Sequence, residues 1–288
     1  MLFRSMGLRP GDGGHHIQGI LRDAAAGSIG CLILLGADPL VDVADTQLVK
    51  AAFAKVQHVI AVDTTLNTSS SAAHVVLPAA AYAEKAGTTT NIEGRVTNVA
   101  RQVTPAGQAR PDWMIAAELA LQLGVDLGYA TVADITDDIA SRVDGFAAAT
   151  AAAVAASPDG VLTDVPTTMQ PLVPPAAEVA DRLTYDFRLV VSRTLYDRAV
   201  GTAQSPSLAG LSTPAAIHVH PLDLDRIGVA PGGSVRVTNG RGSITMTVQP
   251  SDDLLRGSAW VPFNHEGGPI AELLDCTAPV NDVRIETL

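Results

Sequence analysis

Residues 31–39 read Cys31-Leu-Ile-Leu-Leu-Gly-Ala-Asp-Pro39, and this stretch decides the fold of the first half of the chain. Five apolar residues in a row, stopped by glycine and proline, are typical of a parallel strand that is covered on both faces. A strand of that kind buries its cysteine as a small hydrophobic residue. The stretch therefore predicts a parallel sheet with Cys31 in its core.

Helical and extended patterns alternate around this strand. Apolar residues three or four positions apart predict helices, and short apolar runs predict further strands. Strand–helix–strand repetition implies right-handed parallel α/β units. The expected helices cover 17–24, 41–56, 111–124 (with Trp113, Ala116, Ala117, Ala120 and Leu123 on one side) and 134–156, and the expected strands cover 58–62 and 74–77.

The second half of the chain has a different period. Five prolines fall within 157–179, which marks a linker. Beyond Asp186 apolar residues alternate with polar ones, and Asn239-Gly240 between two such runs predicts a hairpin whose turn residues need positive φ. A short helix at 221–228 is closed by glycine. We predict an α/β domain at 6–156, a linker at 157–185, and a mainly β closed barrel at 186–288.

Composition excludes several classes of function. The net charge of −11 argues against binding to nucleic acid or to an anionic membrane surface. No apolar run reaches the roughly 18 residues that a membrane-spanning helix needs. The two cysteines have no C-x-x-C spacing and the seven histidines form no ligand set, so we expect no metal site in this chain.

Two aspartates follow consecutive predicted strands. Asp38 lies in the turn after 31–35, and Asp63 ends the strand at 58–62. Ligands of open parallel sheets bind outside the carboxyl ends of the strands, where these carboxylates can accept hydrogen bonds from a purine or a ribose. The other interpretation is an ordinary turn in which each Asp is a cap. Neither G-x-G-x-x-G nor a P-loop is present, which leaves ordinary dinucleotide or ATP binding without support.

The most polar stretch runs Glu84-Lys-Ala-Gly-Thr-Thr-Thr-Asn-Ile-Glu-Gly-Arg95. One interpretation is a catalytic pair, formed by an ionised Glu84 or Glu93 beside Lys85 or Arg95. The alternative is a hydrogen-bonded loop that fixes one part of the domain to another. We favour the loop.

Three segments together resemble the molybdopterin oxidoreductase superfamily: Leu35-Gly-Ala-Asp-Pro39, Ala73-His-Val-Val-Leu-Pro-Ala-Ala80 and the stretch from Glu84 to Val96. The stretch 217–261 is similar to that superfamily's terminal double-psi β-barrel. The resemblance implies a parallel Rossmann-like domain, truncated at its N-terminus, followed by a double-psi barrel that binds a molybdopterin dinucleotide in active members.

Within the superfamily the chain most resembles the C-terminal part of the G-type subunit of bacterial NADH-quinone oxidoreductase, respiratory complex I, in its actinobacterial form. Four segments carry this resemblance: 191–197, 205–208, 256–260 and 282–288. It implies a non-catalytic region without a cofactor of its own, on the cytoplasmic side of the plasma membrane, in contact with other peripheral-arm subunits. The iron–sulfur clusters of the NADH-to-quinone path then lie in an N-terminal part that this sequence lacks. Its first five residues resemble a translated adapter, so we expect the natural start to lie upstream.

The chain departs from the superfamily at positions near the pterin pocket. Asp38 stands where molybdenum enzymes usually have Asn, and His74 stands where they have Asp. Asp63 matches the position that often recognises the guanine of the pterin dinucleotide. The resemblance therefore implies a vestigial pocket at Asp38 and Asp63.

Two other functions stay open on the sequence alone. One is a fragment of a true molybdopterin enzyme, of the formate dehydrogenase or nitrate reductase type, that binds bis-molybdopterin guanine dinucleotide. The other is a free-standing small-molecule binding protein, which the truncated start disfavours.

Overall fold

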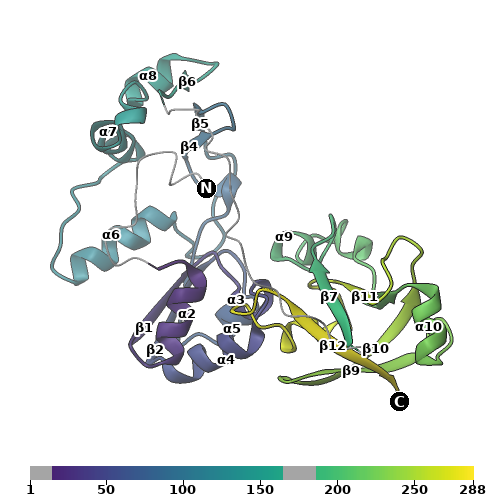
Figure 1. Ribbon diagram of the computed structural model, residues 1–288. Coiled ribbons are helices and arrows are strands. Elements are labelled where there is room, and N and C mark those ends of the chain that lie inside the picture. The colour runs from purple at the N-terminus through teal and green to yellow at the C-terminus, as the bar shows by residue number, and fades with distance from the viewer. Residues whose placement is uncertain (1–14, 165–185) are drawn as a thin grey trace.

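The computed structural model describes residues 15–164 and 186–288 (Figure 1). Most of the predicted linker at 157–185 lies outside the described residues. The limits predicted for the two domains on either side of it stay a prediction. The described residues form a parallel sheet with its helices, a small antiparallel sheet, and a barrel set to one side.

The parallel sheet confirms the prediction drawn from 31–39. Its strands are β1 (Cys31–Leu35), β2 (His58–Asp63) and β3 (Val75–Pro78), paired in the order β1-β2-β3 with both pairs parallel. Helices α2 (Ile17–Ala25) and α4 (Thr46–Lys55) pack on one face. There the strands and helices share a buried core of Leu21, Ala24, Leu32, Leu34, Val49, Ala52, Val59 and Ala61.

The opposite face of this sheet is partly open, and the prediction of a strand covered on both faces is wrong. Strand β1 alternates between exposed and buried positions, and Cys31 is exposed rather than buried. Helix α6 (Asp112–Gln122) covers this face only near the ends of β2 and β3, where Ile115 packs with Val62 and Ala79. Side chains of β1 on this face meet no helix among the described residues.

The helix predicted at 41–56 is two helices. Helix α3 (Pro39–Asp42) ends at Val43, whose backbone is extended, and α4 starts after Asp45. The Asp45 carboxylate accepts a hydrogen bond from the amide of Leu48 at 2.9 Å, so it caps α4 and begins a new helix inside the apolar pattern.

Two further helix predictions are right in position and wrong in detail. Helix α6 ends at Gln122, two residues before Gly124 with its φ of +85°, but it buries Ile115 while Leu123 is exposed. The region 134–156 is helical with interruptions: α7 (Val132–Arg142), the 3-10 helix η2 (Asp144–Phe146) and α8 (Ala151–Ala156).

A small antiparallel sheet lies apart from the parallel one and packs with α7 and α8 (Figure 1). It consists of β4 (Gly87–Thr90), β5 (Arg95–Val99) and β6 (Val161–Leu162), and the 3-10 helix η1 (Tyr82–Glu84) precedes it. Its core joins Val96 to Val143, Phe146, Ala149 and Val154.

The second half confirms the predicted closed barrel, with strand order β10-β8-β11-β7-β12-β9. Two of its strand pairs, β10–β8 and β11–β7, are parallel and the others are antiparallel. The strands are β7 (Asp186–Ser192), β8 (Ile217–Val219), β9 (Ser234–Asn239), β10 (Gly242–Pro250), β11 (Ser258–Pro262) and β12 (Asn281–Thr287). Shorter elements are α9 (Val200–Ala203), η3 (Ala209–Leu211), α10 (Pro221–Ile227) and η4 (Pro269–Glu272).

The predicted hairpin is present, but its turn differs from the expected one. Strands β9 and β10 pair with Asn239 opposite Gly242, which makes Gly240 and Arg241 the loop. Neither Asn239 nor Gly240 has the expected positive φ. Instead the Asn239 side chain shapes the turn by accepting a hydrogen bond from the amide of Arg241 at 2.9 Å.

The glycine that closes α10 gives a prediction on stability. Gly228 has a φ of +79°, and a Cβ there would meet nothing within 4 Å. Gly228→Ala should therefore lower the free energy of unfolding by about 1 kcal/mol through backbone strain alone. Urea unfolding measures this. Gly240→Ala is the matched control, because that loop glycine also has open space but lacks a positive φ; equal losses would contradict the prediction.

Candidate functional site

The carboxyl end of the parallel sheet brings both predicted site residues to one short helix. This helix, α5 (Thr68–Ser71), begins at its N-cap Asn67. Asp38 follows β1 and Asp63 ends β2, and both carboxylates lie at the start of α5. The two side chains are buried, at 4% and 8% exposure.

The Asp38 carboxylate accepts three hydrogen bonds from α5. One oxygen accepts hydrogen bonds from the amide of Ser69 at 2.9 Å and from its hydroxyl at 2.5 Å, and the other accepts from the amide of Thr68 at 3.2 Å. The Ser69 hydroxyl in turn accepts from the amide of Leu40 at the start of α3. Asp38 thus fixes α3 and α5 to each other.

The Asp63 carboxylate is used by the turn that leads into α5. One oxygen accepts from the amide of Thr64 at 2.7 Å, and the other accepts from the Asn67 side-chain amide at 2.8 Å. Asn67 caps α5 through Ser70, whose hydroxyl accepts from the Asn67 amide. The buried hydroxyl of Thr65 has no hydrogen-bond partner.

These contacts decide how well the site fits a guanine nucleotide. Guanine offers N–H donors, so its recognition by a carboxylate needs oxygens that are not already satisfied. Asp38 accepts three hydrogen bonds from inside the chain and Asp63 binds donors on both oxygens. A carboxylate can accept about four hydrogen bonds, so most of the acceptor capacity of both side chains already serves the fold.

Of the charged side chains in the polar stretch 84–95, Glu93 and Arg95 pair with each other, whereas Glu84 and Lys85 have partners elsewhere. Glu84 accepts a hydrogen bond from the amide of Ala81, while Lys85 pairs with Asp112 at the start of α6. Glu93 and Arg95 approach to 3.5 Å across the exposed β4–β5 turn. The contacts match the loop interpretation, because the Lys85 pair joins this stretch to α6.

Several histidines make structural contacts. The ring of His74 accepts from the amide of Val59 at 3.0 Å, which fills the place of the carboxylate expected there. His16 and His220 cap α2 and α10. Among residues 15–164 and 186–288 no group of three or more His, Cys, Asp or Glu could hold a metal ion. In the same residues no helix is long and apolar enough to cross a membrane.

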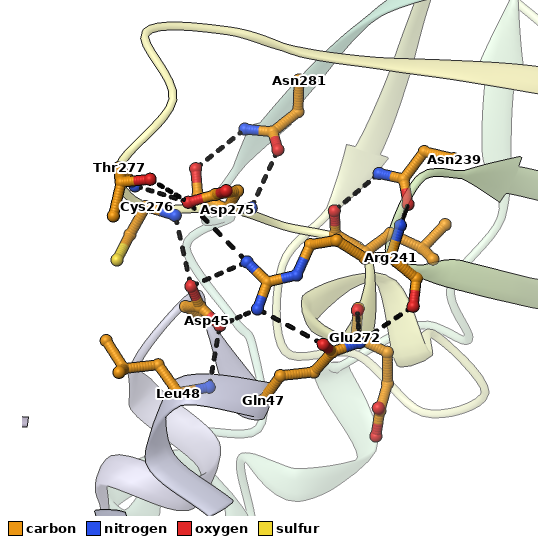
Figure 2. A network of polar contacts seen from close by, with 11 residues as sticks. Asp45, Gln47, Leu48, Asn239, Arg241, Glu272, Asp275, Cys276, Thr277 and Asn281 are labelled. Atoms are coloured by element: carbon orange, nitrogen blue, oxygen red, sulfur yellow. Dashed lines mark hydrogen bonds and ion pairs between the residues drawn. The ribbon is translucent and has the colours of Figure 1, made fainter. Parts of the chain in front are cut away.

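A polar network joins the barrel to the start of α4 (Figure 2). Arg241, at the tip of the β9–β10 hairpin, donates two hydrogen bonds to the buried Asp45 carboxylate, at 2.7 and 2.9 Å. The Gln47 side-chain amide donates to the carbonyls of Arg241 and Glu272, and Lys50 pairs with the Glu272 carboxylate at 2.6 Å. The sequence did not predict this network. The one feature that pointed to it was a charged residue, Arg241, directly after Asn239-Gly240.

A cavity of about 730 Å³ lies at the same junction. Asp42 and Ala44 line it from the α/β half. Strand β7 and the residues near Leu274 and Asn281 line it from the barrel. Arg193 crosses it to pair with Asp42 and stacks over the Phe263 ring. Asp38 and Asp63 do not line it.

A second cavity, of about 380 Å³, opens on the barrel between His218, Trp260 and His265. The rings of His218 and Trp260 lie 4.9 Å apart, and burial lowers the pKa of His218 below its usual value. His265 is held by Thr194 and by the carbonyl of Thr213.

The lowered pKa of His218 predicts a pH dependence. Below about pH 6.5 the unfolded chain takes up a proton that the folded imidazole resists, so the stabilisation present above this pH is lost as pH falls. His218→Phe, which keeps an aromatic ring beside Trp260, should reduce the loss of unfolding free energy between about pH 7.5 and 5.5. Urea titrations at both pH values measure it, and equal losses in the two proteins would refute the prediction.

Comparison with known proteins places both halves in one superfamily. Residues 12–122 match the model of the molybdopterin oxidoreductase family, and residues 187–284 match that of the molybdopterin dinucleotide binding domain. The fold agrees: acetylene hydratase from Pelobacter acetylenicus superposes with a TM-score of 0.72 at 12% identity, over 93% of this chain and 46% of that one. The fold class predicted from sequence, a parallel α/β domain followed by a barrel, is confirmed.

The similar curated proteins are diverse oxidoreductases. The alpha subunit of an NADPH-Fe(3+) oxidoreductase from Geobacter sulfurreducens is 30% identical over 96% of this chain and 32% of its own length. A G-type subunit of the NADH-quinone oxidoreductase from Rhizobium meliloti is 28% identical over 91% of the chain and 31% of its length. An F420-dependent formate dehydrogenase alpha subunit of Methanococcus maripaludis is 27% identical over 81% of this chain and 38% of its own length. The chain spans about a third of these relatives.

Proposed function

Because this chain belongs to the molybdopterin oxidoreductase superfamily and carries its dinucleotide-binding barrel, we propose that it is a non-catalytic structural region of a G-type subunit of NADH-quinone oxidoreductase. In this role it supports electron transfer from NADH to quinone without holding an electron carrier itself. The division into 6–156, 157–185 and 186–288 is part of the proposal.

One observation carries it: the buried Asp38 carboxylate holds helix α5 with three of the about four hydrogen bonds that a carboxylate can accept. Acceptor capacity that serves the chain's own amides and hydroxyl is not available to a ligand. Asp38 and Asp63 lie at the carboxyl end of the sheet, where the pocket would be, but they accept hydrogen bonds from groups of the chain itself. This is expected of a vestigial site.

In this role the region contacts other peripheral-arm subunits on the cytoplasmic side of the plasma membrane. The iron–sulfur clusters belong to another part of the subunit. The ion pair between Arg241 and Asp45 fixes the barrel to the α/β half, which a supporting region requires.

A second candidate is a region of an active molybdopterin enzyme. The unpartnered Thr65 hydroxyl next to Asp63 favours it, since a buried polar atom without a partner is what a ligand would satisfy. The formate dehydrogenase among the similar proteins points the same way. Under this alternative the ligand is bis-molybdopterin guanine dinucleotide.

Native purification separates the two candidates. The tagged protein is isolated from its source cells, and molybdenum and tungsten are measured by mass spectrometry together with guanine nucleotide released on denaturation. We expect neither metal nor nucleotide, and we expect other NADH dehydrogenase subunits in the same fraction. Molybdenum and guanine nucleotide in stoichiometric amounts would overturn the proposal in favour of the active enzyme.

A further inference from the structure

The turn of the β9–β10 hairpin contains the one Asn-Gly dipeptide of the sequence, Asn239-Gly240. Asparagine before glycine is chemically labile, because glycine has no Cβ to hinder attack by its backbone nitrogen on the asparagine side chain. Gly240 is exposed, and a Cβ added there would meet nothing within 4 Å. Sequence and exposure therefore mark Asn239 as a candidate for spontaneous deamidation.

The reaction requires only water. The backbone nitrogen of Gly240 attacks Cγ of Asn239 and forms a new C–N bond. The C–N bond to Nδ2 breaks, and Nδ2 leaves as ammonia together with the amide proton of Gly240. Water then opens the cyclic imide at one of its two carbonyls, which gives Asp or isoaspartate. One water is consumed, one ammonia is released, and no atom is oxidised or reduced.

Two hydrogen bonds fix the side chain that would react (Figure 2). The Nδ2 atom of Asn239 donates to the carbonyl of Leu273 at 2.8 Å, and Oδ1 accepts from the amide of Arg241 at 2.9 Å. Attack on Cγ comes from above the plane of the side-chain amide, and these two bonds fix that plane. Because Nδ2 is also the leaving group, its bond to Leu273 must break. Both contacts therefore oppose deamidation.

The same contacts adjoin the joint between barrel and α/β half, by which we mean the contacts of Asp45 and Gln47 with the barrel. Arg241, next to the labile pair, is held by the buried Asp45 carboxylate. The Gln47 amide donates both to the Arg241 carbonyl and to that of Glu272 in η4. The joint thus ties the hairpin tip to the segment that holds the Asn239 side chain.

We propose that Asn239 is a deamidation site protected by the closed joint, and that its conversion to a carboxylate loosens the joint permanently. A carboxylate has no N–H for the Leu273 carbonyl, so two acceptors face each other where a hydrogen bond was. Isoaspartate also adds a carbon atom to the backbone path of the turn, which displaces Arg241 from Asp45. The inference is independent of the proposed function, since it concerns a reaction of the chain itself.

Deamidation rates test the protection. The purified protein is kept at mildly alkaline pH, and the tryptic peptide 237–241 is analysed for Asp and isoaspartate by chromatography and mass spectrometry. Asp45→Asn keeps a residue type that caps α4 but removes the charge that holds Arg241. We expect Asn239 to deamidate about ten-fold faster in this variant, because opening of the joint precedes the reaction. Asp138→Asn, in an exposed ion pair on α7, is the control with an unchanged rate.

The same protein in urea gives the rate without protection. We expect it to be at least about ten-fold above that of the folded protein, and Gly240→Ala should suppress the reaction in both states. Circular dichroism verifies that Asp45→Asn is folded. Equal rates in the folded protein and in urea, or in the folded protein and folded Asp45→Asn, would overturn the proposal.

Thiol reactivity tests the loosening. The Cys276 amide donates to Asp45, and burial raises the pKa of the Cys276 thiol, so opening of the joint should increase its reactivity. In Asn239→Asp we expect N-ethylmaleimide to alkylate Cys276 about five-fold faster, and the exposed Cys31 at an unchanged rate. Asn98→Asp, at an exposed position of β5, is the control. An unchanged rate at Cys276 in Asn239→Asp and in the isoaspartate fraction would refute the loosening.

Discussion

Replacement of Arg241 by methionine is expected to lower the free energy of unfolding by about 3 kcal/mol. The guanidinium makes a two-point contact with Asp45, whose side chain is almost completely buried. Without Arg241 that charge stays in the interior, where the amides of Leu48 and Cys276 still donate hydrogen bonds to it. The loss is large because the remaining carboxylate is left unpaired, even if the ion pair itself contributes little net energy.

Urea unfolding followed by tryptophan fluorescence measures this loss in both halves. Trp113 lies in α6 and Trp260 lies in β11, so Trp→Phe variants at either position leave one reporter per half. Arg142→Met is the control, because its pair with Asp138 is on the surface of α7 and should cost at most about 0.5 kcal/mol.

A double-mutant cycle shows whether the contact itself is responsible. Asp45→Ala removes the carboxylate and the cap of α4 together. If the pair couples barrel and α/β half, Asp45→Ala with Arg241→Met should cost about 2 kcal/mol less than the sum of the single changes. Additive losses would show that the two residues act independently.

Sequence patterns predicted the elements well because periodicity is a local property. The apolar run at 31–35 gave a parallel strand, and the alternation around Asn239-Gly240 gave a hairpin, as found. The sequence did not predict the end of one helix and the start of the next near Asp45, because a capping aspartate leaves the apolar spacing unchanged.

Properties that depend on tertiary structure could not be predicted in the same way. The strand at 31–35 has the composition of a doubly covered strand, yet coverage depends on what packs against it, and Cys31 is exposed. The Asp45–Arg241 contact joins residues 196 positions apart, and no spacing rule links them. Asp38 and Asp63 were located correctly at the sheet end, but only their hydrogen bonds show which groups they hold.

Asp38→Ala is expected to cost about 3 kcal/mol, because it removes the acceptor of three donors, two of them buried. These are the amides of Thr68 and Ser69 and the hydroxyl of Ser69. Urea unfolding measures the loss. The control is Asp126→Ala, whose exposed carboxylate accepts from one loop amide and whose loss should cost about 0.5 kcal/mol.

Asp38→Asn separates a structural from a ligand-binding role at the same position. The amide keeps one acceptor oxygen but turns an N–H donor towards the donors of α5, so a structural Asp38 predicts an intermediate loss of about 1.5 kcal/mol. A ligand-binding Asp38 predicts, in addition, an altered nucleotide content in the natively purified protein. Since the hydrogen bonds of Asp38 all run to the start of α5, a loss of stability with unchanged nucleotide content supports a purely structural role, and a changed nucleotide content contradicts it.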